Sequence, residues 1–182
     1  MQISKRSVLL LGLILLVACS PVSSPTDSPL EAIKEFSVLA GFRESDLSFV
    51  ETTTMGNSPN GNLLVDLYQD EEGRRFYIEP ITNTVVEMDA RTLLPSHGES
   101  PEGTQMEAAE LEQRAVSFIH AALPQFSSLQ GDLTCEMGNK GANYFFDWRM
   151  KTTEVNFMPP FIQVAMTTSG DMFGYINTVT LP

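Results

Sequence analysis

The sequence predicts an α+β protein with two similar halves, each a helix followed by an antiparallel sheet of about four strands. Two patterns that start helices, one near residue 28 and one near residue 104, predict where each half begins. After each of them comes a helical stretch and then a series of short segments in which apolar and polar residues alternate, as in strands. Residues 91–103 are rich in Pro and Gly and lack apolar periodicity, so they predict a linker between the halves.

Residues 1–18 predict an export signal peptide that is cleaved. Lys5 and Arg6 form a short positive region, and the apolar run Val8–Val17 behind them is too short to span a bilayer comfortably. The alternative is a membrane anchor or a buried helix, but a buried helix rarely starts directly behind two cations. We therefore expect the rest of the chain to be exported.

The end of this segment is more specific. Leu16-Val17-Ala18-Cys19 resembles the lipobox of bacterial lipoproteins, in which two aliphatic or small residues and one small residue precede a cysteine. The resemblance implies that the Cys19 thiol carries diacylglycerol and that Cys19 becomes the first residue of the mature chain. It also implies an extracytoplasmic protein anchored by lipid to a bacterial membrane, with inner and outer membrane both left open. The alternative is a soluble secreted protein whose Cys19 is accidental.

Residues 19–28 are rich in Ser and Pro and predict an extended tether that keeps the folded part off the lipid. Loss of residues 1–18 takes the formal net charge from −12 to −14, because Lys5 and Arg6 leave with them. A chain with this much negative charge is poorly suited to contacts with phosphate groups. We therefore expect no nucleic-acid partner and no flat contact with anionic lipid. The expected link to the membrane is the covalent lipid on Cys19.

The first half is predicted at residues 29–90. Ser28-Pro29-Leu30-Glu31 has the spacing of a capping box, so a helix should begin there and end at Ala40, where Gly41 stops it. Four strands are expected to follow, at Leu47–Thr54, Asn62–Gln69, Arg74–Glu79 and Thr84–Asp89. The acidic run Asp70-Glu71-Glu72-Gly73 is interpreted as a solvated hairpin tip, because it lacks the alternating oxygen ligands of a calcium loop.

The second half is predicted at residues 104–182. Thr104-Gln105-Met106-Glu107 is expected to cap a helix over Gln105–Leu123. Four further strands are expected at Leu133–Met137, Asn143–Lys151, Phe161–Thr167 and Met172–Thr178. Within the first of these, Cys135 shares a face with Leu133 and Met137, so we expect a buried, inert thiol. The aromatic face of Asn143–Lys151 is expected to lie in the core.

The last hairpin of each half resembles the PepSY family of small extracytoplasmic domains. That family tends to show an aliphatic strand, an acidic residue, two variable residues, Thr-Gly and a second aliphatic strand. The first half matches with Glu79 and Thr82-Asn83, and the second with Met166 and Ser169-Gly170. Asn83 stands where Gly is expected, and Met166 where an acidic residue is common. The resemblance implies a protein without catalytic residues that binds or restrains a peptidase or another envelope protein.

The residues themselves predict no catalytic, metal or cofactor site. His97 lies in the linker and His120 near the end of the second helix, and neither has a second ligand at metal spacing. With Cys19 carrying lipid, Cys135 has no partner for a disulfide. A nucleophilic pair of Cys135 and His120 is conceivable in three dimensions, but the inward orientation expected for Cys135 argues against it.

One loop is a candidate partner surface. It consists of Met158, Pro159, Pro160 and Phe161, which combine apolar character with the turn-forming pair of prolines. The alternative is that this loop folds back onto the sheet.

The expected function is therefore that of a lipid-anchored binding protein of the cell envelope. A carrier or sensor of a small apolar ligand, held in a pocket between helices and sheet, is the alternative. An enzyme is the least favoured class, because the sequence shows no catalytic constellation; a buried carboxylate or a Cys–His pair in a cleft would favour it.

Overall fold

The structure is a computed structural model that describes residues 28–58, 61–94, 103–151 and 159–179. The expected export signal 1–18, Cys19, His97 and Met158 lie outside the described residues. The elements in chain order are α1 (Pro29–Ala40), β1 (Leu47–Ser58), β2 (Gly61–Asp70), β3 (Arg75–Glu79), β4 (Thr84–Asp89), the 3-10 helix η1 (Arg91–Leu93), α2 (Ala108–Ala122), α3 (Phe126–Leu129), the 3-10 helix η2 (Gln130–Asp132), β5 (Leu133–Lys140), β6 (Asn143–Met150), β7 (Phe161–Thr167) and β8 (Met172–Asn177).

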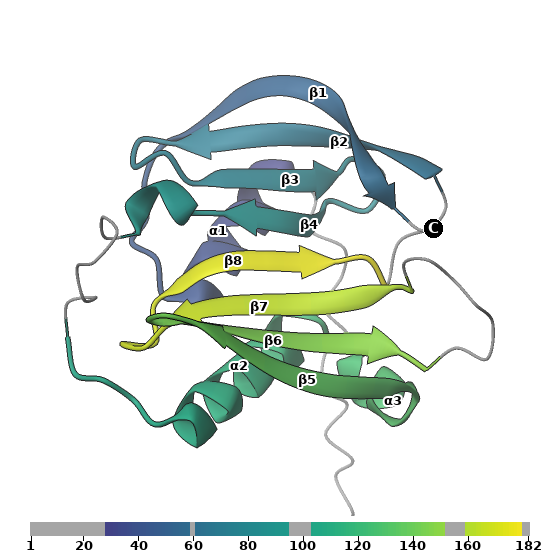
Figure 1. Ribbon diagram of the computed structural model, residues 1–182. Coiled ribbons are helices and arrows are strands. Elements are labelled where there is room, and N and C mark those ends of the chain that lie inside the picture. The colour runs from purple at the N-terminus through teal and green to yellow at the C-terminus, as the bar shows by residue number, and fades with distance from the viewer. Residues whose placement is uncertain (1–27, 59–60, 95–102, 152–158, 180–182) are drawn as a thin grey trace, which may run out of the picture.

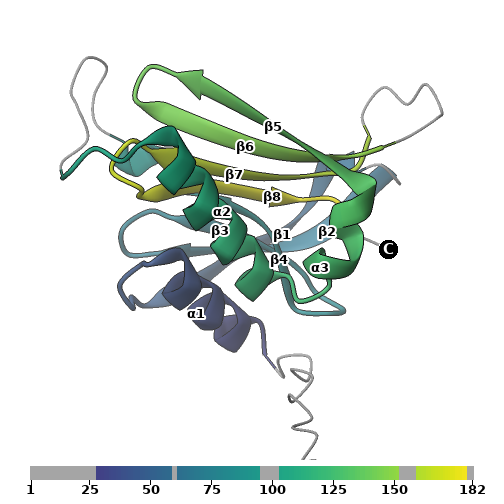
Figure 2. The ribbon, with the colours of Figure 1, turned by 90° about the horizontal axis from the view of Figure 1, so that it is seen from below.

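All eight described strands form one antiparallel sheet in the order β1-β2-β3-β4-β8-β7-β6-β5. The helices lie against one face of this sheet, and the other face, here called the open face, is turned toward the viewer in Figure 1. Figure 2 shows the same layers from below. The α+β class and the antiparallel strands are as expected. The strands of residues 29–90 and 104–182 do not form separate sheets, however, because β4 pairs with β8 in the middle.

Register explains which side chains face the helices. One row of paired residues crosses the whole sheet: Phe49, Tyr68, Phe76, Met88, Tyr175, Val164, Phe146 and Met137. Phe76 and Phe146 within the row are fully buried, whereas the residues at its two ends, Phe49 and Met137, are 54% and 52% exposed. The helices therefore cover the middle of the sheet and leave most of both edge strands uncovered on this face.

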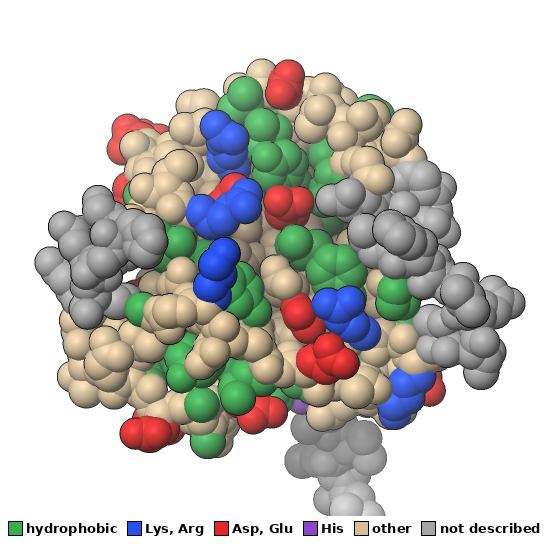
Figure 3. Space-filling model, in the orientation of Figure 1, with side chains coloured by type: hydrophobic (Ala, Val, Ile, Leu, Met, Phe, Trp, Pro, Cys, Tyr) green, Lys and Arg blue, Asp and Glu red, His purple; other side chains and the backbone are tan. Residues whose placement is uncertain are grey.

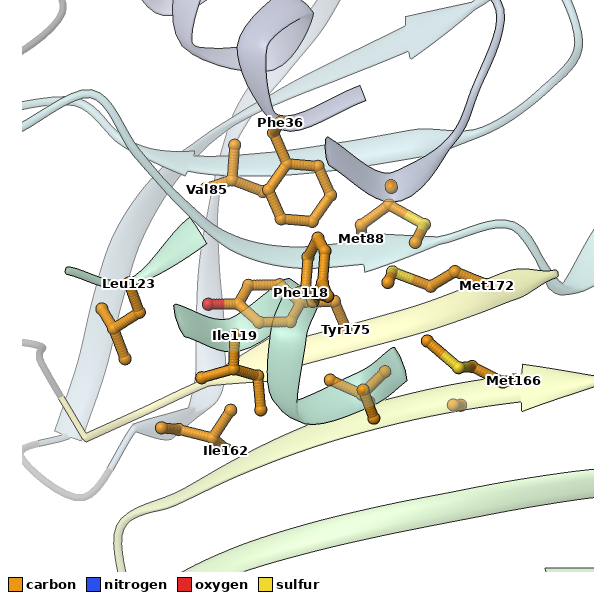
Figure 4. Packing of buried hydrophobic residues seen from close by; sticks show 14 of the residues in the cluster. Phe36, Val85, Met88, Phe118, Ile119, Leu123, Ile162, Met166, Met172 and Tyr175 are labelled. Carbon is orange, nitrogen blue, oxygen red and sulfur yellow. The ribbon is translucent and has the colours of Figure 1, made fainter. Parts of the chain in front are cut away.

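The core is shared between the two parts of the chain. Phe36 from α1 packs with its ring centroid 5.4 Å from that of Phe118 in α2 and 5.1 Å from that of Tyr175 in β8 (Figure 4). Phe118 and Tyr175 are 5.6 Å apart, so the three rings form one cluster. Edge-to-face packing of this kind adds to the burial of apolar area. Residues 29–90 and 104–182 are thus not independent domains.

The first helix follows its sequence signals. The Ser28 hydroxyl accepts a hydrogen bond from the backbone amide of Glu31 at 3.4 Å, and Gly41 ends the helix in the left-handed region at φ 79°. A β-carbon would be strained there, which is why glycine occupies the position. The predicted helix Pro29–Ala40 is confirmed.

The second helix begins three residues later than predicted. The backbone amide of Met106 donates to the carbonyl of Thr168 at 2.8 Å, which holds this stretch extended against the β7–β8 hairpin. Glu107 and Glu110 then cap the helix reciprocally, so the expected cap at Thr104 is wrong. Glycine suits position 170, because its φ of 86° lies in the left-handed region and a β-carbon there would also lie 2.8 Å from the Met106 sulfur.

The thiol of Cys135 is exposed, so the expectation of a buried thiol is wrong. Cys135 does pair with the buried Trp148 and so faces the helix side, as the alternation predicts. It lies on an edge strand, however, beyond the part of the sheet that the helices cover. Periodicity predicts the face of a side chain, but the cover over that face depends on the tertiary fold.

Glu79 closes the β3–β4 hairpin as a buried carboxylate. It accepts hydrogen bonds from the amide of Ile81 at 3.0 Å, the amide of Thr82 at 2.7 Å and the hydroxyl of Thr82 at 2.6 Å. Burial opposes ionisation, but these bonds to the charged form outweigh it and lower the pKa of Glu79. Asn83 in this loop has a positive φ of 53°, and Gly170 in the β7–β8 loop has one of 86°.

Replacement of Glu79 by glutamine should lower stability at neutral pH and flatten the acid side of the stability profile. Because the folded pKa lies below the unfolded value of about 4.3, the carboxylate stabilises the fold above that value, and this contribution is lost as pH falls through the folded pKa. Urea unfolding at a series of acid and neutral pH values measures it.

The control is Glu87→Gln, for which the opposite sign is expected. Burial and repulsion from Asp89 raise the pKa of Glu87 against the opposing effect of Arg91, so the ionised form of Glu87 weakens the fold. A Glu79→Gln protein with the acid slope of the wild type would contradict the assignment.

Candidate functional site

The candidate site is a surface groove of about 500 Å³, here called the α1 groove. It lies between the outer side of α1, the loop that follows it and the turn between β2 and β3. Its lining consists of Lys34, Glu35, Ser37, Val38, Leu39, Phe42, Arg43, Glu44, Ser45, Leu47, Asp70 and Arg74. A volume of this size is typical of sites for small ligands or for side chains of a partner.

Apolar side chains form the floor of the α1 groove. Val38 is 74% exposed and Leu39 is also exposed, because α1 buries Ile33 and Phe36 on its other side. Phe42 and Leu47 are half-buried beside them. Four apolar residues thus meet at one place, although single exposed apolar residues are normal on a protein surface.

A buried ion pair builds one wall of the groove. Asp70 and Arg74 are 6% and 4% exposed, and the Arg74 Nε donates a hydrogen bond to the Asp70 carboxylate. The same carboxylate accepts the backbone amides of Glu72 at 3.0 Å and Arg74 at 2.9 Å. The expectation that Asp70 belongs to a solvated hairpin tip is therefore wrong, whereas Glu71 and Glu72 are exposed as expected.

Arg74 connects this wall to the floor. Its guanidinium carbon lies 4.6 Å from the centroid of the Phe42 ring, within the range of a cation–π contact. One guanidinium nitrogen donates to the carbonyl of Arg43 at 3.3 Å, and another lies 3.0 Å from the Glu72 carboxylate. Since each side of the guanidinium is held, the wall is preorganised for a ligand.

The polar rim of the α1 groove is electrically balanced. Three cations and three carboxylates line it, although the chain as a whole has a formal net charge of −12. The hydroxyl of Ser45 is buried and has no hydrogen-bond partner among the described residues, so it offers one bond to a group that enters. The groove suits an apolar group with a neutral polar atom near it.

Two other hollows are weaker candidates. One of about 600 Å³ lies along the first turns of α2, and Met106 is the one apolar residue in its lining. Another of about 220 Å³ lies between α1 and α2 and includes Phe118 and Met166. Neither combines an apolar floor with a fixed polar wall, which is the combination that binding sites share.

The structure places part of the predicted partner surface. Pro159, Pro160 and Phe161 are half-buried. The Phe161 amide donates to the Thr178 hydroxyl at 2.9 Å, and the carbonyl of Pro160 accepts the amide of Met150 at 3.0 Å. Pro160 and Phe161 are thus bonded to the sheet, and all three residues lie outside the α1 groove.

The other singled-out residues do not meet in a site. His120 is exposed, with its Nδ1 3.1 Å from the hydroxyl of Ser127 and its ring against Phe126. Among residues 28–58, 61–94, 103–151 and 159–179, no three His, Cys, Asp or Glu side chains come together as metal ligands would. None of the described helices combines the length and the apolar character that a membrane span requires.

Comparison with known proteins assigns this chain to no family. No family model matches the chain, and neither a curated protein nor a solved structure matches it.

The sequence interpretation did not find the α1 groove. A signal was present in Val38 and Leu39, two apolar residues that lie off the buried stripe of α1. The wall was harder to find, because Asp70 and Arg74 read as the two ends of a turn rather than as an ion pair. The contact of Arg74 with Phe42 joins segments far apart in the chain and has no local signature.

Proposed function

We propose that this chain is a lipid-anchored extracytoplasmic protein of the bacterial cell envelope that binds or restrains a peptidase or another envelope protein. The α1 groove carries the proposal, because it combines exposed apolar side chains with a wall fixed by a buried ion pair. Such a site receives an apolar side chain of a partner as an anchor. Cys19, through its lipid, would hold the protein at the membrane.

We further propose that the two parts of the chain are similar, PepSY-like repeats. The order of elements supports this, since a helix followed by four strands occurs twice. The sheet order is also symmetric about the β4–β8 pair. Both final hairpins have a hydroxyl residue followed by one with positive φ, Thr82-Asn83 and Ser169-Gly170. The similarity between the two parts of the chain, and to PepSY domains, points to no catalytic residue.

The alternative, a carrier of a small apolar ligand, is favoured by one observation, the volume of the α1 groove. That groove lies on the outer side of α1, however. Between helices and sheet, the described core is filled by side chains such as Phe76, Leu111 and Ile119, which are fully buried. The proposal therefore favours a protein partner.

The test is cross-linking in native membranes with the tagged full-length chain as bait. Aspartate at both Val38 and Leu39 should reduce recovery of the partner about tenfold, because charge would enter an apolar contact. The control is Ile81→Asp, since Ile81 is 86% exposed and lies in the β3–β4 turn, away from the groove. Equal recovery with both baits, or recovery of a lipid without a protein, would rule the proposal out.

The same bait carrying Cys19→Ala separates anchoring from binding. It should leave the membrane fraction yet still bind the partner, because the α1 groove is unchanged. Full retention in the membrane would contradict the lipid anchor. The binding of the partner would still be tested by the groove variants.

A further inference from the structure

A cation without an ionic partner lies on the helix side of the molecule. Arg114 extends from α2 toward the end of α1 and the β7–β8 turn. One guanidinium nitrogen would lie 3.9 Å from a β-carbon on Gly41, and the other would lie 3.4 Å from one on Gly170. Within the part of the chain that the structure describes, the guanidinium makes no hydrogen bond and no ion pair. Its N–H donors are therefore available to an anion.

Two acidic residues of this region are bonded elsewhere. Glu110 stands one helical turn before Arg114, which is the spacing at which glutamate and arginine on a helix pair. Its carboxylate instead accepts the backbone amide of Glu107 at 3.1 Å, as part of the helix cap. Asp171 lies in the β7–β8 turn, and its carboxylate accepts the hydroxyl of Ser169 at 2.8 Å. Neither carboxylate neutralises Arg114 by direct contact.

Arg114 lies where two hollows adjoin, since Arg114 and Ser117 line both of them. The hollow of about 220 Å³ between α1 and α2 is here called the apolar hollow, and its apolar lining consists of Leu39, Ala40, Phe118, Ala121, Met166 and Met172. The hollow of about 600 Å³ along the first turns of α2 is here called the polar hollow, and its polar lining includes Thr104, Gln105, Glu110 and Gln113. Figure 2 shows the two helices side by side on this face of the sheet.

The charge around the apolar hollow differs from that of the open face. Figure 3 shows charged side chains of both signs among hydrophobic ones on the open face, so charge selects no occupant there. Among the described residues that line the apolar hollow, Arg114 is the one charged residue. Phe118, Met166 and Met172 in the same lining are at most 5% exposed. A ligand that places an apolar group in this hollow therefore meets Arg114 with whatever charge it carries nearby, and an anion fits.

The spacing of the charged side chains limits the length of the ligand. Glu110 and Arg114 stand one turn apart along α2, which is about 5.4 Å between backbone positions. An extended peptide spans about 3.6 Å per residue at most, so two residues span about 7 Å. The ammonium and the carboxylate of a very short peptide can thus reach Glu110 and Arg114 at the same time.

We propose that the two adjoining hollows bind a dipeptide or tripeptide that ends in an apolar residue with a free carboxylate. Arg114 binds the terminal carboxylate through two N–H donors, and the apolar hollow receives the last side chain. The polar hollow receives the rest of the backbone, with the terminal ammonium near Glu110. Of the described residues of this site, Leu39 alone also lines the α1 groove, and the inference does not rest on the proposed function of that groove.

The probes for the test are the dipeptide Gly-Leu, its C-terminal amide and hexanoate, each titrated into the purified full-length chain by isothermal titration calorimetry. Gly-Leu should bind about tenfold more tightly than the amide, which lacks the negative charge, and than hexanoate, which lacks the ammonium and the backbone. Absence of saturable binding of Gly-Leu, or equal binding of Gly-Leu and its amide, would overturn the proposal. Hexanoate that binds as tightly as Gly-Leu would indicate a site for aliphatic acids and would overturn it as well.

Two variants test the placement of the peptide. Arg114→Gln should abolish the preference for Gly-Leu over its amide, whereas the control Arg75→Gln, at an exposed arginine of β3, should keep it. Ala121→Leu places a larger side chain in the lining of the apolar hollow and keeps a good helix former, so it should weaken Gly-Leu about tenfold in a protein that still unfolds cooperatively.

Two results would contradict this placement. If Ala121→Leu bound Gly-Leu as tightly as wild type does, the last side chain would not occupy the apolar hollow. If Val38→Asp abolished binding of Gly-Leu and Arg114→Gln did not, the peptide would bind in the α1 groove. Since neither Arg114 nor Ala121 lines that groove, failure of this proposal leaves the proposed function to its own test.

Discussion

Replacement of Asp70 by alanine should lower the free energy of unfolding by about 3–5 kcal/mol. The substitution leaves the guanidinium of Arg74, which is 4% exposed, without its buried carboxylate. The amides of Glu72 and Arg74 lose their acceptor as well. Urea denaturation at neutral pH measures the loss.

Two further variants separate the charge from the packing. The double replacement Asp70→Leu and Arg74→Met should cost less than Asp70→Ala, because neither charge is then left unpaired in the interior. Lys34→Ala serves as the exposed control, since Lys34 lies 3.9 Å from Glu31 at the surface, and it should cost less than about 1 kcal/mol. An Asp70→Ala protein as stable as the control would show that the ion pair does not hold the wall.

The same variants bear on binding. Arg74 touches Phe42 and the carbonyl of Arg43, so its loss loosens both the wall and the floor of the α1 groove. If the groove binds the partner, a folded Arg74→Met protein should bind it more weakly than wild type. The stability of the turn and the recognition of the partner thus depend on one side chain.

Local signals made several elements predictable. Ser28 and Gly41 fix the ends of α1 through a side-chain cap and a positive φ, which depend on neighbours in the sequence. The strands Thr84–Asp89 and Phe161–Thr167 have the predicted bounds, because alternation and turn residues define them. No distant contact is needed for either signal.

The pairing of β4 with β8 depended on information that is not local. Glu87 pairs with Ile176, and Met88 with Tyr175. Most of the second part of the chain separates these partners in the sequence. The sequence holds a hint in Val164-Ala165-Met166, which are three successive apolar residues. All three are buried in the structure. A strand that is buried on both faces is typical of the middle of a large sheet rather than of a small separate one.

The candidate site was less predictable than the fold. Cys135 was assigned to the correct face but to the wrong environment, because no local pattern indicates where the cover of α2 ends. Ser45, whose hydroxyl lacks a partner among the described residues, has no feature in the sequence that distinguishes it from other serines. Sites that form where two elements meet require the tertiary contacts.

Replacement of Phe36 by alanine should lower the free energy of unfolding by about 3–5 kcal/mol and should do so for the whole sheet. Phe36 belongs to α1, yet its ring contacts Phe118 and Tyr175, which lie in residues 104–182. A cavity at this position removes contacts from both parts of the chain (Figure 4). Thermal unfolding followed by circular dichroism gives the loss of stability.

Amide hydrogen exchange then shows whether the loss is shared. With one core, protection should fall by the same free energy in β3 and in β7, although β7 lies in the other part of the chain and pairs with β6 and β8. Val38→Ala is the matched control on the same helix, because Val38 is 74% exposed, and it should change stability by less than about 0.5 kcal/mol. If β3 lost protection while β7 kept it, the two parts would be unfolding separately. The β4–β8 pair would then join two domains, and the ring cluster would be an interface between them rather than a core.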